Sequence, residues 1–198
     1  AFHYSPERLI YLAKVIENIL QDYRCEVKII VDTNDNNIGY AGWGKVEIVR
    51  HPNLEHPFHL TSFHRQHIKD NIDNYDVVCY IEDDILVPYE NYLNYLENFE
   101  ILYPNFVPSF VRIEEANGNK YISDVTEQQT INKIYNIGGK KFVSFPFPQS
   151  YHGFFIIPAK QLKEVMTDKF TELSESRENN ASFVALGLGK KPLVEIEF

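Results

Sequence analysis

The residues of this chain whose types and spacing best suit chemistry are three adjacent carboxylates, Glu82-Asp83-Asp84. They follow the apolar run 77–81, which is typical of a buried strand, and further apolar residues come after them. Carboxylates crowded beside the core are costly unless a cation or hydrogen-bond donors compensate their charge. Hard oxygen ligands suit Mg²⁺ or Mn²⁺, and open α/β sheets bind ligands at the carboxyl ends of their strands. The alternative is an acidic strand-to-helix turn with a capping role.

Histidines form a second group, because five of the seven lie in one stretch: His51, His56, His59, His64 and His67. His64 and His67 are one helical turn apart, as zinc ligands can be. The stretch has no accompanying cysteines and no His-Glu-x-x-His pattern, however. We therefore favour solvent-facing or ligand-contacting roles over a dedicated zinc site. His152 is a better candidate for a further metal ligand or an acceptor contact, with a packed structural histidine as the alternative.

The elements that must position these residues alternate between helix and strand in the first half of the chain, the pattern of a three-layer α/β domain. We expect helices beginning at Ser5 and after Pro88, and over 60–72, 159–166 and 178–188. We expect strands over 26–32, 45–50, 77–81, 106–113, 120–123, 141–145 and 153–157.

Length and charge restrict the possible functions. The 198 residues suit one domain, and the net charge of -9 argues against non-specific binding to nucleic acid or to an anionic membrane. A bound divalent cation would still permit a phosphorylated ligand. No apolar run reaches transmembrane length and the start is not signal-like, so we expect a cytoplasmic protein without a transmembrane segment.

The run Tyr80-Ile81-Glu82-Asp83-Asp84-Ile85 resembles the Asp-x-Asp motif of GT-A glycosyltransferases, and its Glu-Asp-Asp form is similar to that of the N-acetylglucosaminyltransferase I group. The resemblance implies a three-layer α/β/α, Rossmann-like GT-A fold with a mostly parallel mixed central sheet. In this single domain over 1–198, residues 1–105 would bind the nucleotide-sugar and 106–198 would form the acceptor side. Asp84 would be the principal ligand of Mn²⁺ or Mg²⁺, with Asp83 and Glu82 in the donor site.

Other positions resemble the family more weakly. His3 and Tyr4 look like the end of a first strand, where family members hold the nucleobase and ribose. Asp32 resembles the acid that hydrogen-bonds the base, although a strand-end aspartate is also a common turn starter. Arg65 resembles donor-contacting basic residues, and a surface salt bridge is the alternative.

On the acceptor side, the segment 151–157 resembles a returning strand near the acceptor, with His152 and Gly153 at its start. Glycine there would let substrate approach the backbone closely. Glu178 resembles a late acidic catalytic residue, and the alternative is an acid that stabilises a helix N-terminus.

The activity that the resemblance implies is transfer of a sugar from a nucleoside diphosphate sugar, with UDP preferred, to a carbohydrate or other hydroxyl acceptor. Glu178 would be the base of an inverting reaction, whereas a retaining reaction needs no such base. A sugar nucleotidyltransferase is disfavoured, because the loop 3–6 lacks the glycines that grip a triphosphate. A non-catalytic carbohydrate- or nucleotide-binding domain stays open, although no loop of alternating Ca²⁺-binding acids is visible.

Overall fold

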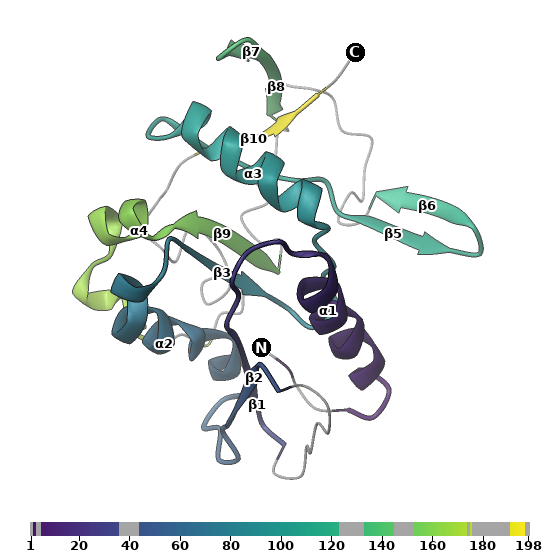
Figure 1. Ribbon diagram of the computed structural model, residues 1–198, viewed down its shortest axis with the longest axis vertical. Coiled ribbons are helices and arrows are strands. Elements are labelled where there is room, and N and C mark those ends of the chain that lie inside the picture. Colours follow the sequence, from purple (N-terminus) through teal and green to yellow (C-terminus); the bar gives the residue numbers. More distant parts are fainter. Residues whose placement is uncertain are drawn as a thin grey trace.

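The computed structural model describes residues 2, 5–35, 44–122, 133–144, 153–173, 175 and 191–196, and Figure 1 shows the arrangement of the elements. Helix α1 (Leu9–Asp22) begins one turn after Ser5, whose carbonyl accepts a hydrogen bond from the Arg8 N–H. Its apolar face, which includes Leu12 and Ile16, packs against strand β1 (Ile29–Thr33).

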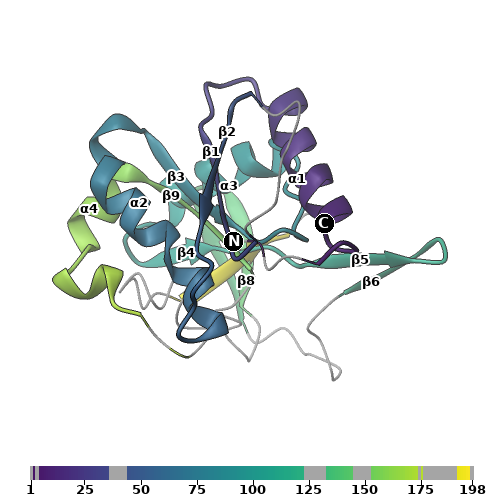
Figure 2. The ribbon, with the colours of Figure 1, turned by 90° about the horizontal axis from the view of Figure 1, so that it is seen from below.

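Strand β1 is the centre of the N-terminal part. Strand β2 (Val46–Arg50) runs parallel to it along one edge, and Phe2 makes a parallel bridge to Thr33 from the other edge. Both predicted strands are present, although β1 begins three residues later than expected. Helix α2 (His64–Asn71) and α1 lie on opposite sides of β1 and β2, so this part is layered helix–strand–helix (Figure 2).

The helix expected over 60–72 is divided into three pieces. The 3₁₀ helix η1 (Pro57–Ser62) precedes α2, and η2 (Ile72–Asn74) follows it. In η1 the Thr61 hydroxyl donates to the Phe58 carbonyl, and the Ser62 hydroxyl donates to the His59 carbonyl. Such local bonds from side chain to backbone compete with regular helix geometry.

The largest core cluster surrounds strand β3 (Val77–Ile81), which pairs antiparallel with strand β9 (Phe154–Pro158). Helices α3 (Tyr89–Leu102) and α4 (Ala159–Val165) pack against this pair, and the 3₁₀ helix η3 (Asp168–Thr171) follows α4. The most deeply buried side chains of the cluster are Tyr95, Phe99, Phe155, Ile156, Ile157 and Leu162.

The remaining strands lie toward the C-terminal end of the chain. Strands β4 (Phe106–Pro108), β10 (Lys191–Glu195), β8 (Lys140–Ser144) and β7 (Lys133–Ile137) form one sheet in that order. Strands β5 (Ile113–Ala116) and β6 (Asn119–Ile122) form an exposed hairpin that projects from the body (Figure 2). We did not expect β7 or β10, and the helix expected over 178–188 lies outside the described residues.

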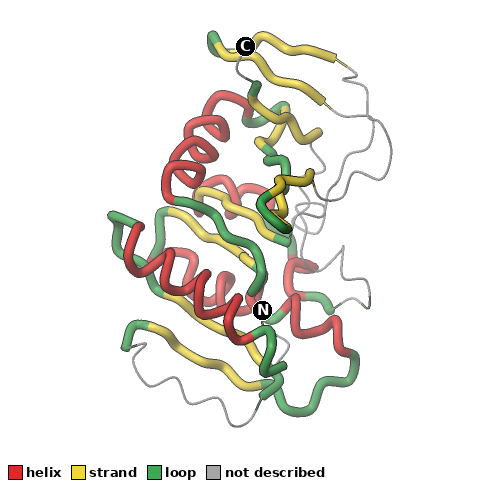
Figure 3. The backbone as a smooth tube through the Cα atoms, turned by 90° about the vertical axis from the view of Figure 1, so that its right-hand side faces the viewer, coloured by secondary structure: helices red, strands yellow, loops and turns green. Residues whose placement is uncertain are grey.

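The fold is mixed α/β, as predicted, but the described strands form four small sheets rather than one central sheet. Only two of the strand pairs described are parallel, β1–β2 and β4–β10; the others, β3–β9, β5–β6, β7–β8 and β8–β10, are antiparallel. The mostly parallel sheet is therefore not found in this part of the chain. Figure 3 shows the strands in separate tiers, with β1–β2 lowest, β3–β9 in the middle and β7, β8 and β10 at the top.

A gap separates β1 from β3. Two cavities of about 140 Å³ each lie there, and Lys28, Ile30 and Cys79 line both of them. Cys25 and Cys79 are both free, and Cys79 faces these two cavities. Among the described helices, none combines the length and the apolarity needed to cross a membrane.

Candidate functional site

The acidic run begins where β3 ends. The Glu82 N–H donates to the Gly153 carbonyl at 2.8 Å, and the Ile85 N–H donates back to the Glu82 carbonyl at 3.2 Å, which closes a turn. Glu82 and Asp83 are buried, with 5% and 4% of their surfaces exposed, whereas Asp84 is exposed. The run predicted from sequence thus follows a core strand and places two carboxylates inside the protein and one outside.

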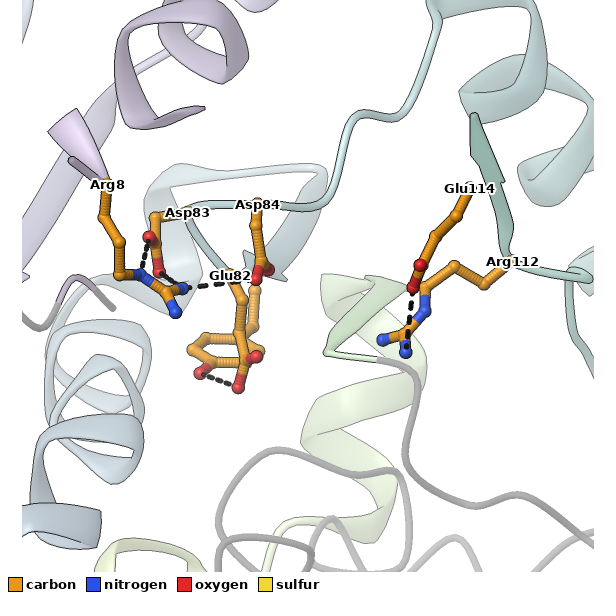
Figure 4. Close-up of polar contacts among 7 residues, drawn as sticks. Arg8, Glu82, Asp83, Asp84, Arg112 and Glu114 are labelled. Atoms are coloured by element: carbon orange, nitrogen blue, oxygen red, sulfur yellow. Dashed lines mark hydrogen bonds and ion pairs between the residues drawn. The ribbon is translucent and has the colours of Figure 1, made fainter. Parts of the chain in front are cut away.

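Arg8, which precedes the first residue of α1, compensates the buried charge of Asp83 (Figure 4). Its Nε and Nη2 donate to the two carboxylate oxygens of Asp83, each at 2.8 Å. Nη2 also lies 3.2 Å from Asp84 Oδ2. The hydrogen bond to Asp83 raises the pKa of the Arg8 guanidinium above its ordinary value. Two parallel, charge-assisted hydrogen bonds between a guanidinium and a carboxylate are strong and fix the geometry of the pair, so Asp83 is held in one orientation.

Glu82 is fixed from a different side. The Tyr80 hydroxyl donates to Glu82 Oε1 at 3.3 Å, and Gly153 lies against the other carboxylate oxygen. Gly153 has a φ of +67°, and a Cβ there would lie 3.2 Å from Ile85 Cγ1 and 3.3 Å from Glu82 Oε2. Gly153, a predicted acceptor-side residue, is therefore brought to the acidic run, at a backbone conformation that favours glycine.

Asp84 is the carboxylate that can take a cation. Its side chain is 42% exposed, and the contact with Arg8 uses one oxygen at 3.2 Å. Mg²⁺ is commonly bound through one or two carboxylates together with phosphate oxygens of the ligand. A single accessible carboxylate beside two fixed, buried ones suits this mode, so the residues present fit Mn²⁺ or Mg²⁺ at Asp84.

Arg65 is buried on α2 rather than exposed in a surface salt bridge. Its Nη1 donates to the Phe170 carbonyl of η3 at 3.4 Å, and 4% of the residue is exposed. Burial lowers the pKa of its guanidinium to about 10, while the nearby Tyr80 acts in the opposite direction. Arg65 thus lies close to Tyr80, which itself contacts Glu82. His3, Tyr4, His152 and Glu178 lie outside the described residues, and their roles stay predictions.

Asp32 is tied to histidines. It lies near the end of β1 with 3% of its surface exposed, and its Oδ1 is 2.8 Å from His51 Nε2 and 3.0 Å from His67 Nε2. His51 follows β2 and stacks on the ring of Phe63, with 3.9 Å between the ring centroids. Helical spacing suggested that His64 and His67 form a pair. Instead, His51 and His67 meet at Asp32, and His64 packs against the ring of Tyr80.

Sequence reasoning missed Arg8, and it missed the pairing of His51 with Asp32. A signal for Arg8 exists, because a cation at the positive end of a helix dipole is unfavourable unless an anion pairs with it. Asp83 is that anion, 75 residues away in the chain. For His51 the local pattern contains no comparable signal, because its partner Asp32 belongs to a different strand.

No family model, curated protein or solved structure matches this chain. Its function must therefore be inferred from the arrangement of its own residues.

Proposed function

We propose that this protein is a metal-dependent glycosyltransferase. It transfers a sugar from a nucleoside diphosphate sugar, with UDP-sugar as the preferred donor, to a carbohydrate or other hydroxyl acceptor. Mn²⁺ or Mg²⁺ held by Asp84 is the cofactor. The proposal includes the three-layer GT-A arrangement implied by the resemblance of the Glu-Asp-Asp run to that family.

The observation that carries the proposal is that the three carboxylates have different environments, two of them buried and one exposed. Asp83 forms an ion pair with Arg8, and Glu82 is fixed by Tyr80 and the Gly153 backbone. Asp84 alone of the three is exposed. A run that served only to cap a turn would not need one unburied carboxylate held beside two buried ones at the carboxyl end of a core strand.

The chain's own residues prepare the site for a charged ligand. Arg8 fixes the orientation of the Asp83 carboxylate, and its Nη2 reaches toward Asp84 Oδ2, so the Asp84 carboxylate is already placed when the ligand arrives. Placing groups in advance reduces the entropy cost of binding. When bound, the cation would neutralise the charge that develops on the departing diphosphate.

The acceptor hydroxyl must lose its proton as the new bond forms. Glu178 is our candidate for the base of an inverting reaction, and Gly153, which packs against Ile85 and Glu82, belongs to the proposed acceptor side. His152 is the neighbouring candidate for an acceptor contact. Donor contacts from His3, Tyr4, Asp32 and Arg65 belong to the same proposal.

A thermal-shift screen tests the donor site. The protein is melted with UDP, GDP, CMP or ADP, each with and without Mn²⁺, and Asp84→Asn is compared with wild type. A ligand present at a hundred times its Kd stabilises the native state by about 2.7 kcal/mol, which for a chain of this size is a rise in Tm of roughly 5–10 °C. We expect that rise with UDP and Mn²⁺ together, and its loss in Asp84→Asn.

Glu90→Gln is the matched control, because Glu90 is an exposed acid just beyond the run. It should respond to UDP and Mn²⁺ as the wild type does. Release of UDP from UDP-sugars then reports turnover directly. If no nucleotide shifts a cooperative melting transition, the transferase proposal fails. Nucleotide binding without any UDP release would instead identify a non-catalytic binding domain.

A further inference from the structure

We propose that Asp32, His51 and His67 form a second metal site, which binds Zn²⁺ and is separate from the oxygen-ligand site at Asp84. The three residues offer two imidazole nitrogens and one carboxylate oxygen, and these atoms all lie within 4.8 Å of one another. The inference does not rest on the transferase proposal: it uses no residue of the acidic run, and it assigns Asp32, a candidate donor contact of that proposal, to the metal instead.

The three ligand atoms lie close enough together to surround one ion. Both Nε2 atoms approach the same oxygen, Asp32 Oδ1, at 2.8 Å and 3.0 Å. Zinc bonds to histidine nitrogen and carboxylate oxygen are about 2.0–2.2 Å long, so two tetrahedral ligands lie roughly 3.3–3.5 Å apart. The observed separations are a few tenths of an ångström shorter, and small ring rotations of the two histidines would open the space that a cation needs.

The fold holds each ligand firmly. Asp32 is in the β1 ladder and has 3% of its surface exposed. The backbone N–H of His51 donates to the Thr33 carbonyl at 2.8 Å, and the His51 ring stacks on Phe63 at an interplanar angle of 10°. His67 projects from α2. Three separate elements therefore direct polar atoms at one point, and the carboxylate among them is buried, where an uncompensated charge is costly.

Ligand chemistry selects the metal. Two imidazoles with one carboxylate match the His₂-carboxylate sets that bind Zn²⁺, whereas Mg²⁺ and Mn²⁺ prefer oxygen ligands such as Asp84. Three protein ligands leave the fourth position to water or a small ligand. That position has room, because Asp32 and His67 also line one of the 140 Å³ cavities between β1 and β3.

Equilibrium dialysis of the chelator-stripped full chain against Zn²⁺, read by elemental analysis, tests the site. We expect about one Zn²⁺ per chain. Loss of an outer-shell partner alone costs a zinc site roughly 10–100-fold in affinity, so His51→Ala and His67→Ala should each weaken binding on the order of a hundredfold or more. His59→Ala, from the same histidine-rich stretch but outside the cluster, should bind as the wild type does.

Two further measurements separate the alternatives. Asp84→Asn should keep its Zn²⁺ whatever happens to its nucleotide response, so failure of one proposal does not imply failure of the other. Co²⁺ bound to the wild type should give the intense visible bands of a four-coordinate nitrogen–oxygen site, without a thiolate charge-transfer band. A thiolate band would assign the metal to a cysteine and overturn the inference.

Absence of stoichiometric Zn²⁺ would also overturn it, as would unchanged binding in both histidine variants. Melting curves of the metal-free variants show whether they remain folded. If either variant fails to fold, the Co²⁺ spectrum of the wild type still decides the matter, because a weak six-coordinate spectrum contradicts the proposed site.

Discussion

Burial of His64 should make the stability of this protein depend on pH in a way that a single substitution removes. Both ring nitrogens of His64 are shielded from water, and the ring packs against Tyr80 and Phe155. Burial lowers the pKa of His64 well below its ordinary value of 6.5, and the positive charge of Arg65 acts in the same direction. The folded protein therefore keeps this histidine neutral.

The direction and the size of this pH effect on the free energy of unfolding follow from proton linkage. Above pH 6.5 the histidine is neutral in both the folded and the unfolded chain, and its contribution to stability is fully present. As the pH falls below 6.5, the unfolded chain binds a proton that the folded chain does not, so the free energy of unfolding decreases. One proton gives a slope of at most about 1.4 kcal/mol per pH unit. Between pH 7.5 and 5.5 the loss is up to about 1.4 kcal/mol, or roughly 3–6 °C in Tm for a chain of this size.

The assay compares wild type with His64→Phe by urea denaturation at pH 7.5, 6.5 and 5.5, with chelator present so that no metal contributes. Phenylalanine preserves the ring contacts with Tyr80 and Phe155 but does not titrate. We expect the difference in stability between the two proteins to change by up to about 1.4 kcal/mol over this range, in favour of the variant at low pH. His59→Phe is the control and should follow the wild type. Parallel pH profiles of wild type and His64→Phe would refute the reasoning.

Three other substitutions or labelling experiments test features of the fold. Gly153→Ala should lower the free energy of unfolding by about 1–3 kcal/mol, because the positive φ and the contacts of the new Cβ are both unfavourable. Gly44→Ala is the control: nothing lies within 4 Å of its new Cβ, and it should change the free energy of unfolding by about a few tenths of a kcal/mol. Glu195→Gln should cost about 1–2 kcal/mol at pH 7 in urea denaturation, since the carboxylate accepts hydrogen bonds from three side chains on α3 and β8. Although burial acts in the opposite direction, those bonds lower the pKa of Glu195 below its ordinary value of 4.5. The cost of the substitution should therefore shrink as the pH falls below 4.5, and a cost independent of pH would contradict this. Burial raises the pKa of Cys79 to about 12, so iodoacetamide at pH 8 should label Cys25 and spare Cys79 in the native protein. In urea it should label both cysteines, and intact-mass measurements would distinguish the two outcomes.

Local patterns were enough to predict the elements that carry the acidic run. The apolar residues from Val77 to Ile81 form β3 with the predicted limits, and the helix expected after Pro88 begins at Tyr89. These segments are long and strongly apolar on one side, so their burial agrees with their local preference. The strand expected over 106–113 was too long, because β4 ends at Pro108, and proline has no N–H to continue a ladder.

Contacts between distant segments could not be read from the sequence. Arg8 and Asp83 are 75 residues apart, and Asp32 and His67 are 35 apart. Strand β10 was missed because it is short, contains Pro192 and gains its stability from β4 and β8, which precede it by many residues. Local periodicity predicts that a segment is extended or helical, but it does not specify which segments meet.

The gap between β1 and β3 leaves two strand edges facing each other, with no ladder between them in the described residues. Extended backbone that lay in this gap, in line with the bridge from Phe2 to Thr33, would have a hydrogen-bonding partner on each side. Because successive side chains of a strand point to opposite faces, they would enter the two cavities alternately. Such strand addition would join the β1–β2 and β3–β9 pairs into one continuous sheet.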